Sequence, residues 1–278
     1  GRGLCLSCTP VADAAASLGV PILSPERLGP AEREAVAALR PDVLAVFAYG
    51  TIFGPKFMAL FPAGGINAHP SLLPRWRGCA PIPYAILNRD PVTGVSIQRV
   101  APRMDSGDVL LRREIVLDGT ETTESLSALA ATIGAGLLAR ALDGLAAGTL
   151  AGEPQDESAA TYSCALSKDA GLVDWNRSAL DIDARIRAFH PWPGSFTAFS
   201  GERLAVLAAR PWPDADSGGA RAEPGTVLAV DRSKGIMVQT GEGLIALSRL
   251  QLRGKKPMDF KDFANGARGL VGTRLGAT

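Results

Sequence analysis

The sequence is poor in histidine and cysteine, and it lacks long apolar runs. It holds two histidines and four cysteines among 278 residues, although apolar residues make up 46% of the chain. No stretch of about eighteen consecutive apolar residues is present to span a membrane, and no segment has the pattern of a secretory signal peptide. We therefore expect a globular cytoplasmic protein, of a bacterial cytosol or alternatively an organellar matrix, with no membrane partner.

Missing motifs disfavour catalysis by a metal or by a covalent nucleophile. Cys5 and Cys8 form a lone CxxC, and a zinc site would need a second ligand pair at comparable spacing. The sequence has no GxSxG nucleophile elbow, no P-loop and no HExxH motif. We therefore expect reduced thiols, no metal, and direct transfer of a group from a bound donor to a bound nucleophile.

Apolar runs bounded by glycine or proline alternate with helix-like segments in the first half of the chain. This alternation is typical of an α/β fold with a Rossmann-like, doubly wound parallel sheet covered on both faces. The expected strands are 20–23, a central strand at 42–49, and the segments GGINAHP, GVSIQRV and GDVLLRREIVL. The expected helices are 31–40, 80–88 and 122–148.

A change of pattern near residue 149 predicts a second domain. Residues 149–165 are polar and irregular, as linkers are, and they separate a catalytic domain at 1–148 from a C-terminal domain at 166–278. After an expected helix at 179–189, the short runs TVLAV, GIMVQTG and LIALSRLQL indicate a small β-barrel or sandwich. The second domain is also the basic one, since residues 166–278 carry 16 bases against 12 acids and residues 1–165 carry 13 against 16.

Asn67 and His69 are the strongest candidates for chemistry. Residues i and i+2 of a strand point to the same face, and Pro70 places both at the end of the strand, where open parallel sheets bind ligands. An amide and an imidazole held there are suited to stabilising an oxyanion and passing a proton. Asp105, in the turn RMDSGD, would orient the imidazole if the fold brings it near. His190, in AFHPWPG, is expected to be structural.

The chain resembles the folate-dependent formyltransferases around these residues. The N-x-H followed by SLLP is shared by that superfamily, which includes glycinamide ribonucleotide and amino-sugar formyltransferases. The extension SLLPRWRGCAPIPYAILNRDPVTGVSIQRV, followed by MDSGDVL, more closely resembles the methionyl-tRNA formyltransferase family, and residues 166–197 and 250–266 narrow the resemblance further. The resemblance covers essentially the whole chain.

The resemblance implies a reaction for the first domain. Asn67, His69 and Asp105 match the family's catalytic trio. The α-amine of methionyl initiator tRNA would attack the formyl carbon of 10-formyltetrahydrofolate. Asn67 would donate to the oxyanion, protonated His69 would shuttle the proton to the departing nitrogen, and Asp105 would orient His69. The segment of Ser71, Leu72, Leu73 and Pro74 matches the family's contact with the folate.

For the C-terminal domain, the resemblance implies an OB-like β-barrel that touches the acceptor arm of tRNA. Lys255 and Lys256 are the residues expected to contact phosphate, because they lie in a basic stretch, residues 249–278, with 7 bases and two acids. The family also implies a monomer.

The N-terminus departs from the family pattern. The chain begins at Gly1, inside a loop that in the family contacts the acceptor end of tRNA, so we expect roughly forty residues of the usual pattern to be absent. The letters LCLSC stand where the family usually carries lysines, which leaves Arg2 as the candidate contact in this loop. Two alternatives stay open: a formyltransferase for a nucleotide-linked amino sugar, and a non-catalytic tRNA-binding remnant.

Overall fold

The computed structural model describes residues 8–50, 52–212 and 222–276, so Arg2 and Cys5 lie outside the described residues. The chain packs into two compact units, of which the first comprises the described residues of Gly1–Leu44 and Thr51–Gly64. That unit holds three helices, α1 (Pro10–Ser17), α2 (Pro30–Ala38) and α3 (Pro55–Met58). Each begins with proline, whose missing N–H costs nothing in the first helical turn.

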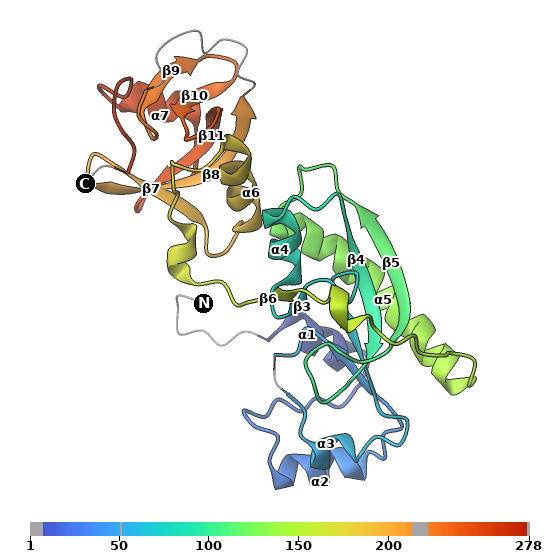
Figure 1. The fold of residues 1–278 in the computed structure, drawn as a ribbon. Coiled ribbons are helices and arrows are strands. Elements are labelled where there is room, and N and C mark those ends of the chain that lie inside the picture. The colour runs from blue at the N-terminus through green and yellow to red at the C-terminus, as the bar shows by residue number, and fades with distance from the viewer. Residues whose placement is uncertain (1–7, 51, 213–221, 277–278) are drawn as a thin grey trace. The chain divides into compact units, whose positions relative to one another are not determined.

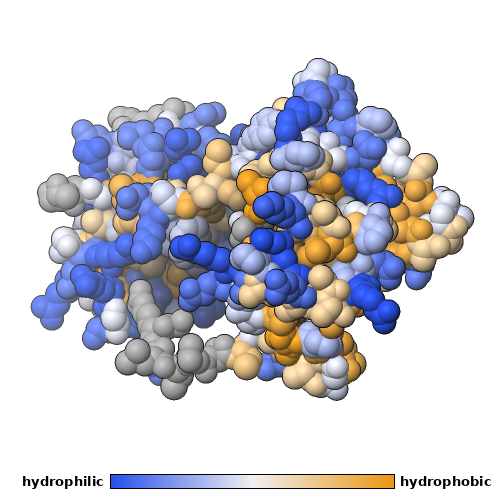
Figure 2. All heavy atoms as spheres, turned by 90° about the horizontal axis from the view of Figure 1, so that it is seen from below, coloured by the Kyte–Doolittle hydropathy of each residue, from blue (hydrophilic) through white to orange (hydrophobic). Residues whose placement is uncertain are grey.

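The predicted strand at 20–23 is wrong, whereas the predicted helix at 31–40 is confirmed as α2. Residues 20–23 form no strand, and the side chains of Val20, Ile22 and Leu23 are exposed. An apolar run becomes a strand only when a neighbouring strand pairs with it, and no described segment does so here. Figure 2 shows hydrophobic residues among hydrophilic ones on the face that it draws.

The second unit comprises the described residues of Ala45–Gly50 and Gly65–Thr278, and it holds most of the predicted catalytic domain and the C-terminal domain. A four-stranded sheet forms the centre of the catalytic domain. Its strands are β1 (Leu44–Phe47), β2 (Gly65–His69), β4 (Val92–Arg99) and β5 (Val109–Val116), in the order β1-β2-β4-β5 (Figure 1). The α/β class is confirmed, but the expectation of a wholly parallel sheet is corrected, because β2–β4 and β4–β5 are antiparallel. β1 ends the order of described strands and is therefore not central. The misreading arose because β4 is buried on both faces, as parallel strands are.

Two further predicted helices are present, α4 (Pro81–Leu87) and α5 (Thr123–Ala146), of which α5 covers this sheet and α4 packs on α5. Helix α5 has the length and apolar composition of a membrane span. It nevertheless runs along the sheet (Figure 1) and buries one stripe against it, consisting of Leu126, Ala130, Gly134, Leu137 and Ala141. That stripe packs on Ile66, Ala68, Val95 and Ile97 of β2 and β4. The 3.6-residue periodicity of the contacts is that of a helix in the core of a globular domain.

The C-terminal domain contains a second, antiparallel sheet, as predicted. Its strands are β7 (Ser195–Phe199), β8 (Glu202–Trp212), β9 (Val227–Asp231), β10 (Gly235–Gln239), β11 (Leu244–Leu252) and β12 (Met258–Asp259). They follow the order β7-β8-β11-β10-β9, with β12 pairing β11. Helices α6 (Ala179–Ala188) and α7 (Phe260–Gly266) complete its core. No ladder between β7 and β9 is recorded among these described strands, so closure of an OB-like barrel stays a prediction.

The segment expected to be an irregular linker packs against the first domain. Its described part contains the 3₁₀ turn η1 (Glu157–Ala159) and the short strand β6 (Tyr162–Ser163). β6 pairs in parallel with β3 (Arg77–Gly78), and Glu153 bridges to Val109 of β5. A second 3₁₀ turn, η2 (Lys168–Gly171), follows before α6. The domains are thus joined by a segment with its own hydrogen-bond partners.

Candidate active site

β2 directs Asn67 and His69 to the same face, as the sequence predicts. Their neighbours Ile66 and Ala68 lie in the core beneath α5, so the alternation of the strand sends the two polar residues to the opposite face. The strand ends at His69. Asn67 is partly buried, and its side-chain amide has no hydrogen-bond partner within the described chain, so this amide is free to bind a ligand. His69, in contrast, is only 4% exposed.

Asp105 lies in the turn between β4 and β5 and faces His69. One carboxylate oxygen, Oδ1, is 3.6 Å from His69 Nδ1. The same oxygen accepts a hydrogen bond of 2.7 Å from Gln98 Nε2, and Oδ2 accepts one of 2.9 Å from the Gly78 backbone N–H. The fold therefore brings the carboxylate to the imidazole and fixes it with two other donors.

The His69 ring is held between Asp105 and a backbone carbonyl. Its Nε2 atom lies 2.8 Å from the Trp76 carbonyl oxygen, which only accepts, so the hydrogen resides on Nε2 when the ring is neutral. Burial lowers the pKa of His69, while the charge of Asp105 and the Trp76 carbonyl act in the opposite direction. The ring is therefore neutral at neutral pH. A second proton would reside on Nδ1, where Asp105 stabilises it.

The segment 71–74, expected to contact folate, is fastened across β4. Ser96 Oγ donates to the Ser71 carbonyl at 2.7 Å and accepts from the Leu73 N–H at 3.2 Å. Leu72 packs on Gly94, where a Cβ atom would overlap the Leu72 side chain. Ser71 and Leu73 are buried, whereas Leu72 and Pro74 are partly exposed. Surface for a ligand in this segment therefore comes from Leu72 and Pro74.

Asp90, which follows the C-terminus of α4, fixes the next part of this loop. Its carboxylate accepts hydrogen bonds from the Trp76 indole N–H at 2.7 Å and from Arg75 Nε at 2.9 Å. The hydrogen bond and charge of Asp90 raise the pKa of Arg75. Asp90 thereby holds Trp76, whose backbone carbonyl lies 2.8 Å from His69 Nε2.

The sequence reasoning missed Asp90, Ser96 and Gln98. Gln98 lies opposite Asn67 in the β2–β4 register, and Ser96 lies opposite His69. One signal was available for these two: they are polar residues that alternate with Val95 and Ile97, which indicates a polar face. No comparable pattern marks Asp90.

Lys255 and Lys256 lie far along the chain from this constellation, in the turn between β11 and β12. Both are exposed, and neither has an ion-pair partner in the described parts of the chain. The turn is shaped by a hydrogen bond of 2.7 Å from Gln251 Nε2 to the Lys255 carbonyl. Two unpaired ammonium groups on a short turn suit an anionic partner.

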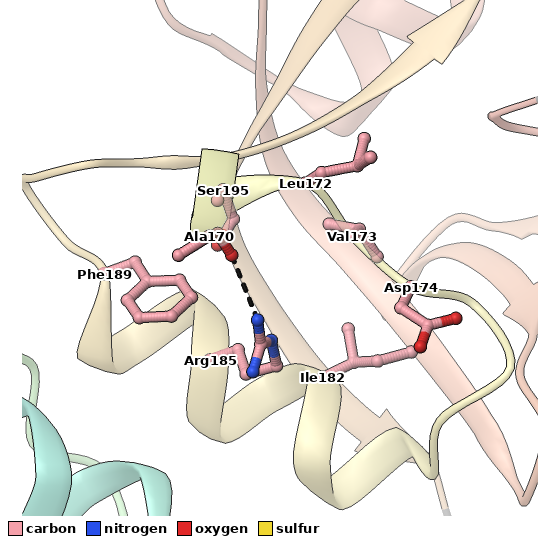
Figure 3. Close-up of a pocket in the computed structure, with 9 residues that line it drawn as sticks. Ala170, Leu172, Val173, Asp174, Ile182, Arg185, Phe189 and Ser195 are labelled. Atoms are coloured by element: carbon pink, nitrogen blue, oxygen red, sulfur yellow. Dashed lines mark hydrogen bonds between the residues drawn. The ribbon is translucent and has the colours of Figure 1, made fainter. Parts of the chain in front are cut away.

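A separate small cavity lies beside α6 and does not belong to the candidate site. In Figure 3 the Arg185 guanidinium points at the Ala170 carbonyl, to which it donates at 3.0 Å, and the Phe189 ring lies beside it. The volume is about 10 Å³, room for a single water molecule. A folate is far too large for this cavity.

Comparisons with known proteins show the family to which this chain belongs. Residues 9–142 match the model of the formyl transferase family, and residues 165–268 match that of the formyl transferase C-terminal domain. A methionyl-tRNA formyltransferase from Treponema pallidum is 50% identical over 91% of this chain and 78% of its own length. This chain belongs to the methionyl-tRNA formyltransferase family. The family member of Roseiflexus castenholzii is 43% identical over 99% of this chain and 87% of its own length.

Solved structures of more distant proteins share the fold. HypX from Aquifex aeolicus, in complex with tetrahydrofolic acid, has a TM-score of 0.63 at 17% identity, covering 88% of this chain and 42% of that one. The N-formyltransferase from Helicobacter canadensis, in complex with folinic acid and dTDP-3-aminofucose, has a TM-score of 0.61 at 14% identity, covering 84% and 81%. At such low identities the likeness concerns the fold alone. The identity to methionyl-tRNA formyltransferases is therefore what separates this chain from amino-sugar enzymes.

Proposed function

We propose that this protein transfers the formyl group of 10-formyltetrahydrofolate to the α-amino group of methionyl initiator tRNA, for translation initiation. The observation that carries the proposal is the convergence of Asn67, His69 and Asp105 at the end of β2. The names of relatives with 50% and 43% identity supply methionyl-tRNA as the acceptor of the formyl group. An amide, an imidazole and a carboxylate held together can stabilise an oxyanion and move a proton, which are the two tasks of acyl transfer to an amine.

Asn67 stabilises the charge of the reaction in this proposal. Its unpartnered amide donates a hydrogen bond to the formyl oxygen as that oxygen becomes negative. His69 is neutral in the resting protein, because burial lowers its pKa, and it accepts the proton that the attacking amine loses. This differs from the expectation of a histidine protonated at the outset. The imidazolium, stabilised by Asp105, then returns the proton to the departing nitrogen of the folate.

The loop before α4 provides the folate contact in this proposal. Leu72 and Pro74 offer partly exposed apolar surface, and Ser71 and Leu73 are buried anchors that hold the backbone in place. Ser96 fixes that backbone at two points. A flat pteridine ring system suits an apolar surface whose rim carries fixed polar groups. Solved neighbours bound to tetrahydrofolic acid and folinic acid support a folate donor.

Lys255 and Lys256 contact the phosphate backbone of the tRNA in this proposal. They are exposed and unpaired in the described structure, and contacts of this type add affinity without reading sequence. The contribution of Arg2 stays a prediction from the sequence.

A formylation assay with the purified protein tests the proposal. Charged initiator tRNA and a nucleotide-linked amino sugar are offered separately with 10-formyltetrahydrofolate, and formylated products are separated and counted. We expect product with the tRNA only, and about 10² to 10³-fold less of it from Asn67→Ala, the cost of one oxyanion donor. Asn88→Ala is the control, because this exposed amide bonds only the carbonyl of Tyr84.

Three outcomes contradict the proposal. Turnover of the amino sugar alone would assign the rival substrate. Binding of tRNA with no turnover at saturating donor would assign a non-catalytic tRNA-binding protein. Full activity of a folded Asn67→Ala variant would show that the Asn67 amide does not stabilise the developing negative charge on the formyl oxygen.

A further inference from the structure

The segment between the two domains reaches Asp105 from two directions. On one side, β6 pairs with β3, so that Gly78 and Ser163 are partners in register. Gly78 is the residue whose N–H binds Asp105 Oδ2. On the other side, Gln155 inserts its amide into the turn that contains Asp105. The connecting segment therefore contacts Gly78, which donates to the Asp105 carboxylate, and it also contacts the backbone of Asp105 itself.

The orientation of the Gln155 amide is dictated by its partners. Its Nε2 atom donates to the Asp105 carbonyl at 2.9 Å and to the Gly107 carbonyl at 2.6 Å. Its Oε1 atom accepts from Arg77, at 2.8 Å from Nη2 and 3.1 Å from Nε. A carbonyl only accepts and a guanidinium only donates, so the opposite orientation would lose all four hydrogen bonds. The amide hydrogens of Gln155 thus bind residues 105 and 107, and Nε2 also lies 3.4 Å from Gln98 Oε1.

Arg77 donates to the Gln155 side-chain oxygen and is itself held by an ion pair with Glu157. Arg77 is only 1% exposed, and its guanidinium meets Glu157 through two hydrogen bonds, of 2.9 and 3.1 Å. The hydrogen bond with Glu157 is the main cause that raises the pKa of Arg77. A bidentate pair of this kind fixes direction as well as distance. The Gln155 oxygen consequently rests on a rigid support.

The turn needs such a clamp because Asp105 has a strained backbone. Its φ angle is 50°, in the left-handed region, which costs a residue with a side chain about 1 kcal/mol. Asp105 shares this turn with Gly107, which is buried against the Arg99 carbonyl. Without the two hydrogen bonds from Gln155, the carbonyls of 105 and 107 would lose those partners and the turn would be free to relax.

We propose that Gln155 is a positioning residue for formyl transfer, which holds the Asp105 turn so that the carboxylate faces His69. The inference rests on the proposed function for its effect on rate, but the geometry at His69 is measurable without substrate. Gln155 touches neither reacting group and acts through Asp105, directly at its backbone and by way of Gln98, whose amide binds the carboxylate.

Several charged groups lie around this turn in the described part of the chain. Asp105 is the carboxylate that faces the His69 ring, and Arg77 and Glu157 form a pair behind Gln155. Exposed Arg103 also pairs with Glu157, with 3.4 Å between Arg103 Nη1 and Glu157 Oε2. Asp108, at the end of the turn, is exposed. If Asp105 turns away, His69 loses the charge that raises its pKa, so its titration midpoint moves to lower pH.

The experiment compares three variants of the full chain. Gln155→Ala removes the clamp, and Gln155→Glu keeps an acceptor for Arg77 but has no amide hydrogens. Gln239→Ala is the matched control, because this buried glutamine also donates to two backbone carbonyls, those of Thr240 and Gly243, in the C-terminal sheet. The readouts are kcat and KM for both substrates, the melting temperature, and the NMR titration of the His69 ring. The chain has two histidines, so the imidazole signal that disappears in His190→Gln belongs to His190 and the one that remains belongs to His69.

Both Gln155 variants should lower kcat by tenfold to about 10²-fold with little change in either KM, since a misplacement of about 1 Å has this cost. Gln155→Ala should also move the His69 midpoint to lower pH. Gln239→Ala should lower the melting temperature and leave both kcat and the midpoint unchanged. The inference is overturned if Gln155→Glu keeps wild-type kcat, or if both Gln155 variants match the control in kcat and midpoint. Failure of Asn67→Ala to lose activity would instead overturn the proposed function, whatever the titration gives.

Discussion

Asp105 is bound more tightly by Gln98 than by His69. The Gln98 amide donates to Oδ1 at 2.7 Å, whereas His69 Nδ1 lies 3.6 Å from the same oxygen. The carboxylate therefore keeps its orientation while the ring is neutral, and its charge is already in place when the ring gains a proton. Such an arrangement spares the reorganisation that an unrestrained carboxylate would undergo during the reaction.

Asp105→Asn should lower kcat by about 10²-fold, the scale of a general acid–base contribution. The asparagine has one oxygen for the two donors of Gly78 and Gln98, so an NH₂ group would face one of them. It also lacks the charge that stabilises protonated His69. Single-turnover formylation measures the loss, and Asp108→Asn, an exposed carboxylate of the same turn, serves as the control. Equal rates for the two variants would exclude a role for Asp105.

His69 should make the stability of the protein fall in mild acid. Its pKa is lowered in the folded state, so below the unfolded value of about 6.5 the unfolded chain binds the proton first and the folded state loses stability. The loss grows as pH falls through the folded pKa and amounts to about 1.4 kcal/mol for each pKa unit of lowering.

Urea unfolding at pH 7 and pH 5 measures this loss. The wild type and His190→Gln should lose stability between these pH values, and His69→Gln should lose less. His190, the other histidine of the chain, is the comparison: its side chain is 38% exposed and its Nε2 atom lies 3.3 Å from Glu124 Oε2. A wild-type loss that persists undiminished in His69→Gln would show that another group carries the effect.

Gly94→Ala should weaken the folate contact and destabilise the first domain. The new methyl group would overlap Leu72 and the Arg113 carbonyl, and overpacking of this kind costs about 1 to 3 kcal/mol. The displaced Leu72 should raise KM for the folate donor more than KM for the tRNA. Gly136→Ala is the matched control, because this helical glycine has open space around it and the change should stabilise α5 by up to about 1 kcal/mol. A melting temperature and folate KM like those of the control would refute the close packing of Leu72.

Short-range signals in the sequence were sufficient to predict which side chains of β2 point to the same face of the sheet. Asn67 and His69 alternate with apolar residues, and Pro70 ends the strand, so local periodicity determines which side chains share a face. The helices α2, α4, α5 and α6 were equally predictable, because their apolar stripes and boundaries are local features.

Contacts between distant segments were not predictable from these signals. Gln155 lies in a polar stretch that resembles a linker, and only the folded chain shows that its amide fits the carbonyls of residues 105 and 107. The antiparallel pairing of β4 was hidden for a related reason: burial on both faces looks the same in either strand direction. The strands β7 and β8 were missed because their apolar runs are interrupted by polar and small residues, although the folded sheet buries alternate positions.

Lys255 and Lys256 should contribute to tRNA affinity through charge alone. Replacing both by glutamine should weaken binding at low salt and reduce the slope of log K against log salt concentration by up to about two units, since each phosphate contact releases roughly one counterion. Filter binding from 50 to 300 mM salt, a range chosen to span strong and weak screening, measures the slope. Arg113→Gln with Arg140→Gln is the control, because these are also exposed bases but lie on β5 and α5, outside the basic C-terminal stretch. An equal slope for the wild type and the double lysine variant would exclude the β11–β12 turn from the tRNA interface, whereas an equal loss in the control would assign the effect to net charge rather than to this turn.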